Sequence, residues 1–156
     1  MSTSSELNFK VSSIPNKLIY YPGLNPSEKK LVEQYPKDAI TVFIQKTRAE
    51  WASDHNFPTQ ELNDEGDAFR HFIWAGLLTK ELGKDQALKF LNAHEDNRLQ
   101  PADERDMDSS NNQSGIRAAQ NLIGEKKFNI ENLEQKALDE LREKRLEVIS
   151  PGLPIP

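Results

Sequence analysis

Ionisable and amide side chains are concentrated between residues 67 and 112 of the sequence. The set comprises two histidines, one arginine, three carboxylates and two asparagines: Asp67, Arg70, His71, His94, Glu95, Asp108, Asn111 and Asn112. Imidazole and carboxylate groups are the side chains that bind divalent metals or transfer protons near neutral pH. We therefore expect these residues to form one site.

One chemistry open to this set is metal-assisted hydrolysis. The candidate ligands are His71, His94, Asp67 and Asp108, a combination that suits Zn²⁺, Mn²⁺ or Fe²⁺. Asp67 and His71 are four residues apart, which places both on one face of a helix. The HExxH zinc signature is absent, because Arg98 stands four residues after His94.

A second chemistry needs no metal. His94 or Glu95 would act as general acid or base, Asp67 would orient His71, and Arg70 would stabilise negative charge. The residues expected in catalysis by either route are His71, His94, Glu95, Asp108 and Arg70. Those expected to contact the substrate are Asn111, Asn112 and Trp74.

A structural interpretation of the same residues stays open. Buried ionisable groups are costly unless they are paired and hydrogen-bonded. Arg70 bridging Glu95 or Asp108 would then form a network that only holds helices together.

Apolar periodicity, with proline and glycine at the segment ends, predicts an all-α protein of about six helices. Asn25-Pro26 and Pro36 mark helix starts, while Gly83 and Gly124 mark helix ends. The segment "KLIYY" is the one candidate for a short strand. The expected helices cover about residues 26–34, 36–57, 64–82, 85–95, 102–123 and 130–146.

The three middle helices each carry a core-facing stripe that turns polar at one end. The polar end is the N-terminus in helices 64–82 and 102–123 and the C-terminus in helix 85–95. If consecutive helices pack up and down, all three polar ends meet at one end of the bundle. Gly76 and Gly115 would allow close helix packing, and Trp51 and Trp74 are expected in the core.

The length of 156 residues favours a single domain, 1–156. We expect an irregular N-terminal segment (1–24), a core (25–124), a C-terminal helix (125–148) and an extended proline-rich tail (149–156). The net charge of −5 disfavours extended nucleic-acid binding, which needs clustered basic residues. The absence of cysteine removes disulfides and thiolate chemistry.

No stretch reads as a Sec signal or a membrane span. We therefore expect a protein that is cytoplasmic in a producing bacterium, with any export by a signal-independent secretion system.

The motif residues resemble a domain family of bacterial secreted proteins, found at the C-termini of Rhs-type and wall-associated polymorphic toxins. The resemblance covers about residues 25–124, including "NPSEKKLVEQYPKDA". Its pattern reads Asp-Ala-x-Arg-His, then His-Glu, then Met-Asp-x-x-Asn-Asn-x-x-Gly. The matching residues are Asp67, Ala68, Arg70, His71, His94, Glu95, Met107, Asp108, Asn111, Asn112 and Gly115. Phe72-Ile73 departs from the family's alanine followed by an aromatic.

The resemblance implies a toxin or effector context rather than a particular reaction. We expect a secreted bacterial effector with hydrolase activity on a cell-wall or phosphodiester substrate. Its partners would be a cognate immunity protein or a component of the secretion machinery. The alternative is a non-enzymatic binding, immunity or adaptor module whose polar cluster is a structural network.

Overall fold

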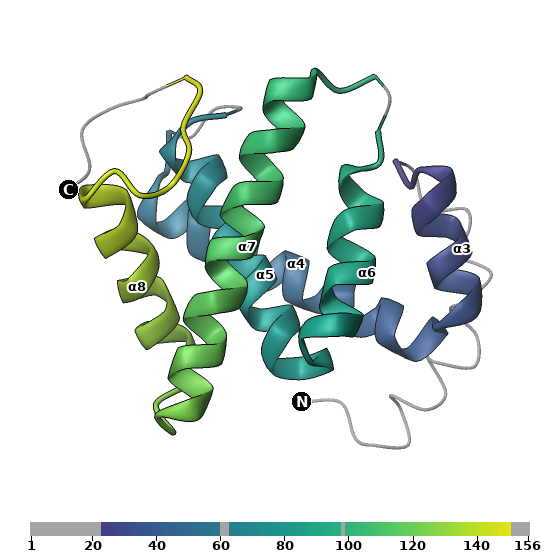
Figure 1. The fold of residues 1–156 in the computed structure, drawn as a ribbon, viewed down its shortest axis with the longest axis horizontal. Helices are drawn as coiled ribbons and strands as arrows, with labels where there is room; N and C mark the ends of the chain where they lie inside the picture. Colours follow the sequence, from purple (N-terminus) through teal and green to yellow (C-terminus); the bar gives the residue numbers. More distant parts are fainter. Residues whose placement is uncertain (1–22, 60–62, 98, 151–156) are drawn as a thin grey trace.

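The computed structural model describes residues 23–59, 63–97 and 99–150, which form six helices and no strand (Figure 1). The predicted all-α class is confirmed. The "KLIYY" segment and residues 151–156 of the tail lie outside the described residues. The helices are α3 (Pro26–Gln34), α4 (Pro36–Asn56), α5 (Glu65–Leu82), α6 (Lys84–Glu95), α7 (Ala102–Gly124) and α8 (Ile130–Arg142).

Local sequence signals set the boundaries of the first helices. Asn25 caps α3, with its side chain accepting from the Glu28 amide while Glu28 accepts from the Asn25 amide. Pro26 and Pro36 occupy first-turn positions of α3 and α4, where no helical N–H is needed. Gly83, at a φ of 80°, separates α5 from α6.

Helix α5 lies at the centre of the bundle and packs against α4, α6, α7 and α8. Phe69, Phe72 and Ile73 are fully buried, as expected for a helix that is covered on most sides. Gly115 of α7 lies directly against the Phe72 backbone, and Gly76 of α5 lies against Leu133 of α8. The predicted close approaches at both glycines are confirmed.

Helix α8 ends at Arg142, four residues before the predicted end near Leu146. Lys144 adopts a φ of 56°, and the Arg145 amide donates to the Glu140 carbonyl, so the chain turns back on itself. No glycine marks this turn in the sequence. This turn buries Leu146 in the core and leads residues 145–150 across to α7 (Figure 1).

The two tryptophans differ in burial. Trp74 is buried and donates its indole N–H to the Val42 carbonyl at 3.2 Å. Trp51 is 81% exposed, so its predicted place in the core is wrong. Ala49 and Ala52 provide the buried face of α4 here, and this leaves Trp51 on the solvent side.

Candidate acid-histidine centre

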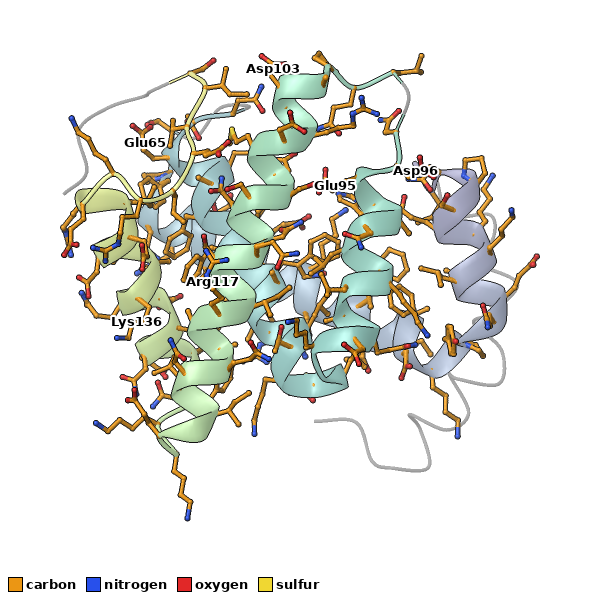
Figure 2. The ribbon with its side chains drawn as sticks, viewed as in Figure 1. Glu65, Glu95, Asp96, Asp103, Arg117 and Lys136 are labelled. Atoms are coloured by element: carbon orange, nitrogen blue, oxygen red, sulfur yellow. The ribbon has the colours of Figure 1, made fainter. Side chains whose placement is uncertain are left out.

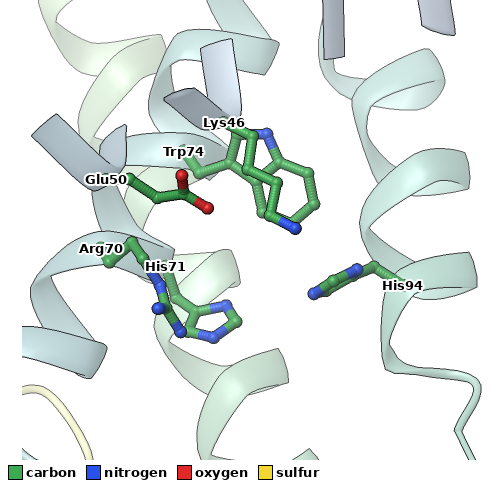
Figure 3. A pocket seen from close by; sticks show the side chains of 6 residues that line it. All are labelled: Lys46, Glu50, Arg70, His71, Trp74 and His94. Atoms are coloured by element: carbon green, nitrogen blue, oxygen red, sulfur yellow. The ribbon is translucent and has the colours of Figure 1, made fainter. Parts of the chain in front are cut away.

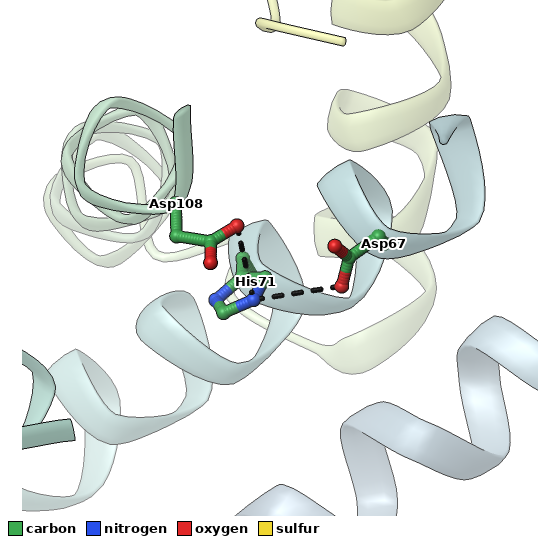
Figure 4. A group of neighbouring side chains, drawn as sticks. All are labelled: Asp67, His71 and Asp108. Atoms are coloured by element: carbon green, nitrogen blue, oxygen red, sulfur yellow. Dashed lines mark ion pairs between the residues drawn. The ribbon is translucent and has the colours of Figure 1, made fainter. Parts of the chain in front are cut away.

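His71 of α5 is surrounded by carboxylates from three helices. Its Nε2 lies 3.3 Å from Asp108 Oδ1 on α7 and 3.6 Å from Asp67 Oδ1 on α5 (Figure 4). Its Nδ1 lies 3.7 Å from Glu95 Oε1 on α6. Figure 2 shows Glu95 between α6 and α7. The predicted meeting of three polar helix ends is therefore present.

Asp67 is held in place by its own helix end. One carboxylate oxygen, Oδ2, accepts from the Asn63 amide at 2.9 Å, and Oδ1 pairs with Arg70. Asp64 caps α5 by accepting from the Asp67 amide. Burial is the main cause that raises the pKa of Asp67, and the Arg70 charge opposes it.

Asp108 and Glu95 have no cation paired with them apart from any charge on His71, among the residues the structure describes. Burial, reinforced by the charge of Asp108, raises the pKa of Glu95 to about 8. Burial, reinforced by the charge of Asp67, raises the pKa of Asp108 to about 6. Gln100 donates to Asp108 Oδ2 at 3.0 Å and partly offsets this. Without a cation, the centre therefore limits its negative charge by keeping carboxyl groups protonated, Glu95 above all.

The same burial acts on His71 in the opposite direction. It lowers the pKa of His71 well below its usual range, and the charges of Arg70, His94 and Lys46 lower it further. The imidazole is thus neutral at physiological pH, which is the form that binds metals.

Several buried polar atoms in the described residues have no hydrogen-bond partner, although natively folded proteins satisfy most such atoms. One of them, Nδ1, belongs to the His71 ring, and two others, Glu95 Oε1 and Asp108 Oδ1, lie beside it. The Asn112 side chain is close enough to shift the pKa of His71 and of Glu95, but it is not aligned for a hydrogen bond with these atoms. His71 Nε2 and Asp108 Oδ1 are close, but the two groups are not aligned for a hydrogen bond.

Asp67, His71 and Asp108 form a group that could hold a metal ion. Their ligand atoms lie within 4.8 Å of one another. Ligands about 2.1 Å from an ion in a tetrahedral site are about 3.4 Å apart, so the widest pair of the group would close by up to about 1.4 Å. Arg70 contacts Asp67 Oδ1 as well, so an ion would share that oxygen with the guanidinium.

His94, a predicted metal ligand, lies outside this group. Consecutive helical residues point about 100° apart, so only Glu95 of the pair faces the His71 ring edge. The His94 Nδ1 is 3.0 Å from Glu28 Oε2, and the His94 and Trp74 rings are nearly perpendicular, with centroids 4.9 Å apart. The rings of His71 and His94 are 6.4 Å apart, which suits two groups acting on one substrate.

The two predicted substrate-binding asparagines differ. Asn111 is fully buried, and its amide donates to the Glu147 carbonyl and accepts from the Glu147 amide, each at 2.9 Å. A contact of Asn111 with substrate would require these bonds to break, so we assign it an anchoring role. Asn112 lies beside His71 and Glu95, and its Oδ1 has no partner among the described residues.

Two cavities border His71. A cleft of about 370 Å³ is bordered by Asp67, His71, Glu95 and Asp108, among others. A smaller pocket of about 110 Å³ borders the same helix; Figure 3 shows its walls, which are Lys46, Glu50, Arg70, His71, Trp74 and His94. Arg70, His71 and His94 border both cavities.

Sequence reasoning missed the contributions of Glu28, Lys46 and Gln100. Glu28 reads as the partner in a capping box, and this local role hides its second contact with His94. Lys46 reads as part of the solvated face of α4. Only the three-dimensional packing places these residues near His71.

The fold and site define an all-α protein with a buried acid-histidine centre. The chain belongs to the family described as "Domain of unknown function (DUF6973)", whose model matches residues 29–144. No curated protein and no solved structure matches the chain. Among the described residues, no helix is both long and apolar enough to cross a membrane.

Proposed function

We propose that the protein is a hydrolase of the bacterial effector type, with a divalent metal bound by Asp67, His71 and Asp108. The observation that carries this proposal is the buried Asp108 Oδ1, which has no hydrogen-bond partner among the described residues and lies 3.3 Å from His71 Nε2 in a group that also includes Asp67. A cation there would neutralise the buried negative charge. The effector context rests on the motif resemblance alone.

The residues around the proposed ion have distinct roles. A Zn²⁺, Mn²⁺ or Fe²⁺ ion held by these residues would supply a water molecule that loses its proton more easily. Glu95 would serve as the base for a water in the cleft, since a neighbouring cation would lower the pKa of its carboxyl. Arg70 stabilises negative charge on the substrate, and His94, oriented by Glu28, protonates the leaving group.

The competing interpretation is a binding or immunity module with a structural network. The bonds from Asn63 to Asp67 and from Gln100 to Asp108 favour it, because both support the centre. The test below therefore compares a substitution of Glu95, in the centre, with the same substitution of Glu134, a partly buried glutamate outside the centre.

The test is expression in the bacterial cytoplasm and, separately, in the periplasm. We expect the wild-type chain to arrest growth in one compartment and Glu95→Gln to abolish the arrest while keeping a native circular dichroism spectrum. Glu134→Gln is the matched control, because burial also raises the pKa of Glu134 but that residue lies on α8, away from the centre.

Metal binding is measured on the purified protein by calorimetric titration with Mn²⁺ and Zn²⁺. One ion per chain, lost in Asp108→Asn, supports the proposal. Wild-type protein that binds neither ion and leaves growth unchanged in both compartments would overturn it and favour the structural network.

A further inference from the structure

The small pocket beside His71 is basic where the cleft is acidic. Lys46 of α4 and Arg70 of α5 contribute positive charge, with Arg70 also paired to Asp67, and Glu50 contributes one negative charge. The cleft is bordered instead by Glu28, Asp67, Glu95, Glu104 and Asp108, with Arg70 as its one cation among the described residues. The two cavities therefore attract ligand groups of opposite charge.

The Lys46 ammonium group is free to bind an anion. Lys46 is half-buried, yet no carboxylate among residues 23–59, 63–97 and 99–150 forms an ion pair with it. In Figure 3, its ammonium group, the Arg70 guanidinium and a ring nitrogen of His94 border the same space, with Glu50 on the other side from His94. Half-buried cations bind oxyanions more strongly than fully solvated ones, because the local dielectric is lower.

The size of the pocket limits what it can hold. Its volume of about 110 Å³ is well below the roughly 300 Å³ at which pockets for whole small molecules begin. A single tetrahedral oxyanion fits this volume, whereas a peptide segment or a pair of sugar rings does not.

We propose that this pocket binds the phosphate group of the substrate, so that the substrate is a phosphate ester. The inference rests on the proposed hydrolase function and specifies its substrate class. Hydrolysis breaks one P–O ester bond and forms one P–O bond to the water oxygen. The water gives a proton to Glu95, and the leaving oxygen receives one from His94.

The first experiment titrates inorganic phosphate into the metal-free protein, followed by calorimetry. We expect saturable binding that Lys46→Met weakens roughly tenfold or more, as for the loss of one charge-assisted contact. Lys37→Met, an exposed site on the same helix, should leave the affinity within about twofold. Glu50→Gln should strengthen binding, because it removes the one negative charge of the pocket.

Acetate and N-acetylglucosamine serve as comparison ligands. Equal binding of acetate, or an affinity for phosphate that is unchanged in Lys46→Met, would overturn the phosphate assignment. A dinucleotide and a soluble short-chain phospholipid are then offered as substrates. Whichever is hydrolysed shows whether the phosphate ester comes from a nucleic acid or from a lipid.

The two proposals can fail separately. Phosphate binding without metal binding or hydrolysis would refute the hydrolase and keep the anion pocket. Metal binding without phosphate binding would refute the pocket and keep the hydrolase.

Discussion

At the scale of single residues, burial lowers the pKa of the histidine of the centre and raises the pKa of its carboxyl groups. His71 favours its neutral form, and Glu95 and Asp108 favour their protonated forms, because each then avoids a charge in a poorly solvated place. In the metal-free protein, the centre is thus stable because its histidine is neutral and its carboxyl groups tend to keep their protons. This state has a measurable pH dependence.

The free energy of unfolding of the metal-free protein should fall as the pH rises from 6.5 to 8. In this window an unfolded glutamate is ionised, whereas folded Glu95, with a pKa of about 8, still holds its proton. The folded state binds more protons, so raising the pH destabilises it, by at most about 1.4 kcal/mol per pH unit. His71 opposes this slope near pH 6.5, where an unfolded histidine is about half protonated while folded His71 is neutral, and it adds little above about pH 7.5.

Urea denaturation in the presence of a chelator at several pH values measures this slope. Glu95→Gln should flatten it and Glu134→Gln should keep it. Stability that is level or rises across the window would contradict the assignment of a proton to Glu95.

At the scale of helices, the contact between α5 and α7 sets the geometry of the centre. Its carboxylates Asp67 and Asp108 belong to these two helices, and Gly115 fixes how closely they pack. A side chain at that position would separate them.

Three glycine-to-alanine variants should rank by what the new methyl group meets. In Gly115→Ala it overlaps the Phe72 backbone, which cannot move aside, and we expect a loss of about 3 kcal/mol or more. In Gly76→Ala it lies 2.7 Å from the flexible Leu133 side chain, so the loss should be smaller. In Gly124→Ala it meets nothing within 4 Å, and a gain of up to about 1 kcal/mol follows from helix propensity.

Thermal denaturation of the three variants gives this ranking directly. Equal losses at Gly115 and Gly124 would mean that the α5–α7 contact is looser than described.

Most of the helices could be predicted because their ends carry explicit signals, such as Asn25-Pro26, Pro36 and Gly83. The end of α8 could not, since Lys144 adopts a left-handed conformation without a glycine or asparagine to announce it. Trp51 was misplaced because periodicity identifies an apolar side chain and not whether a neighbouring helix covers it.

The centre was predictable where its residues share one helix and not where they come from different helices. Residues spaced along one helix, such as Asp67 and His71, have a fixed relation that the sequence reveals. Glu28 and Lys46 come from other helices, so their approach depends on packing angles that the sequence does not specify. The predicted role of His94 as a ligand depended on that packing as well.

At the scale of the whole molecule, a bound ion would link α5 to α7 across the core. At about one hundred times its dissociation constant, Mn²⁺ or Zn²⁺ should add about 2.7 kcal/mol to the stability. For a chain of this length this raises Tm by roughly 5–10 °C. Asp108→Asn should show no such rise, and a rise that persists in this variant would place the ion elsewhere.

The C-terminal segment, residues 145–150, is fastened to the same bundle by Asn111. Asn111→Ala should speed hydrogen exchange at the Glu147 amide, because its acceptor is lost. Asn121→Ala, at an exposed position of the same helix, is the control and should leave that exchange unchanged. An equally protected Glu147 amide in both variants would show that other contacts hold the segment.

Asn63 also joins the far end of this segment to the centre. Its carbonyl accepts from the Ser150 amide at 3.0 Å, and its own amide donates to Asp67. Tension applied at Ser150 would therefore pass through a single residue to the carboxylate, in parallel with the covalent path into α8. Whatever displaces the segment at Ser150 therefore also disturbs the backbone amide that holds the Asp67 carboxylate in the centre.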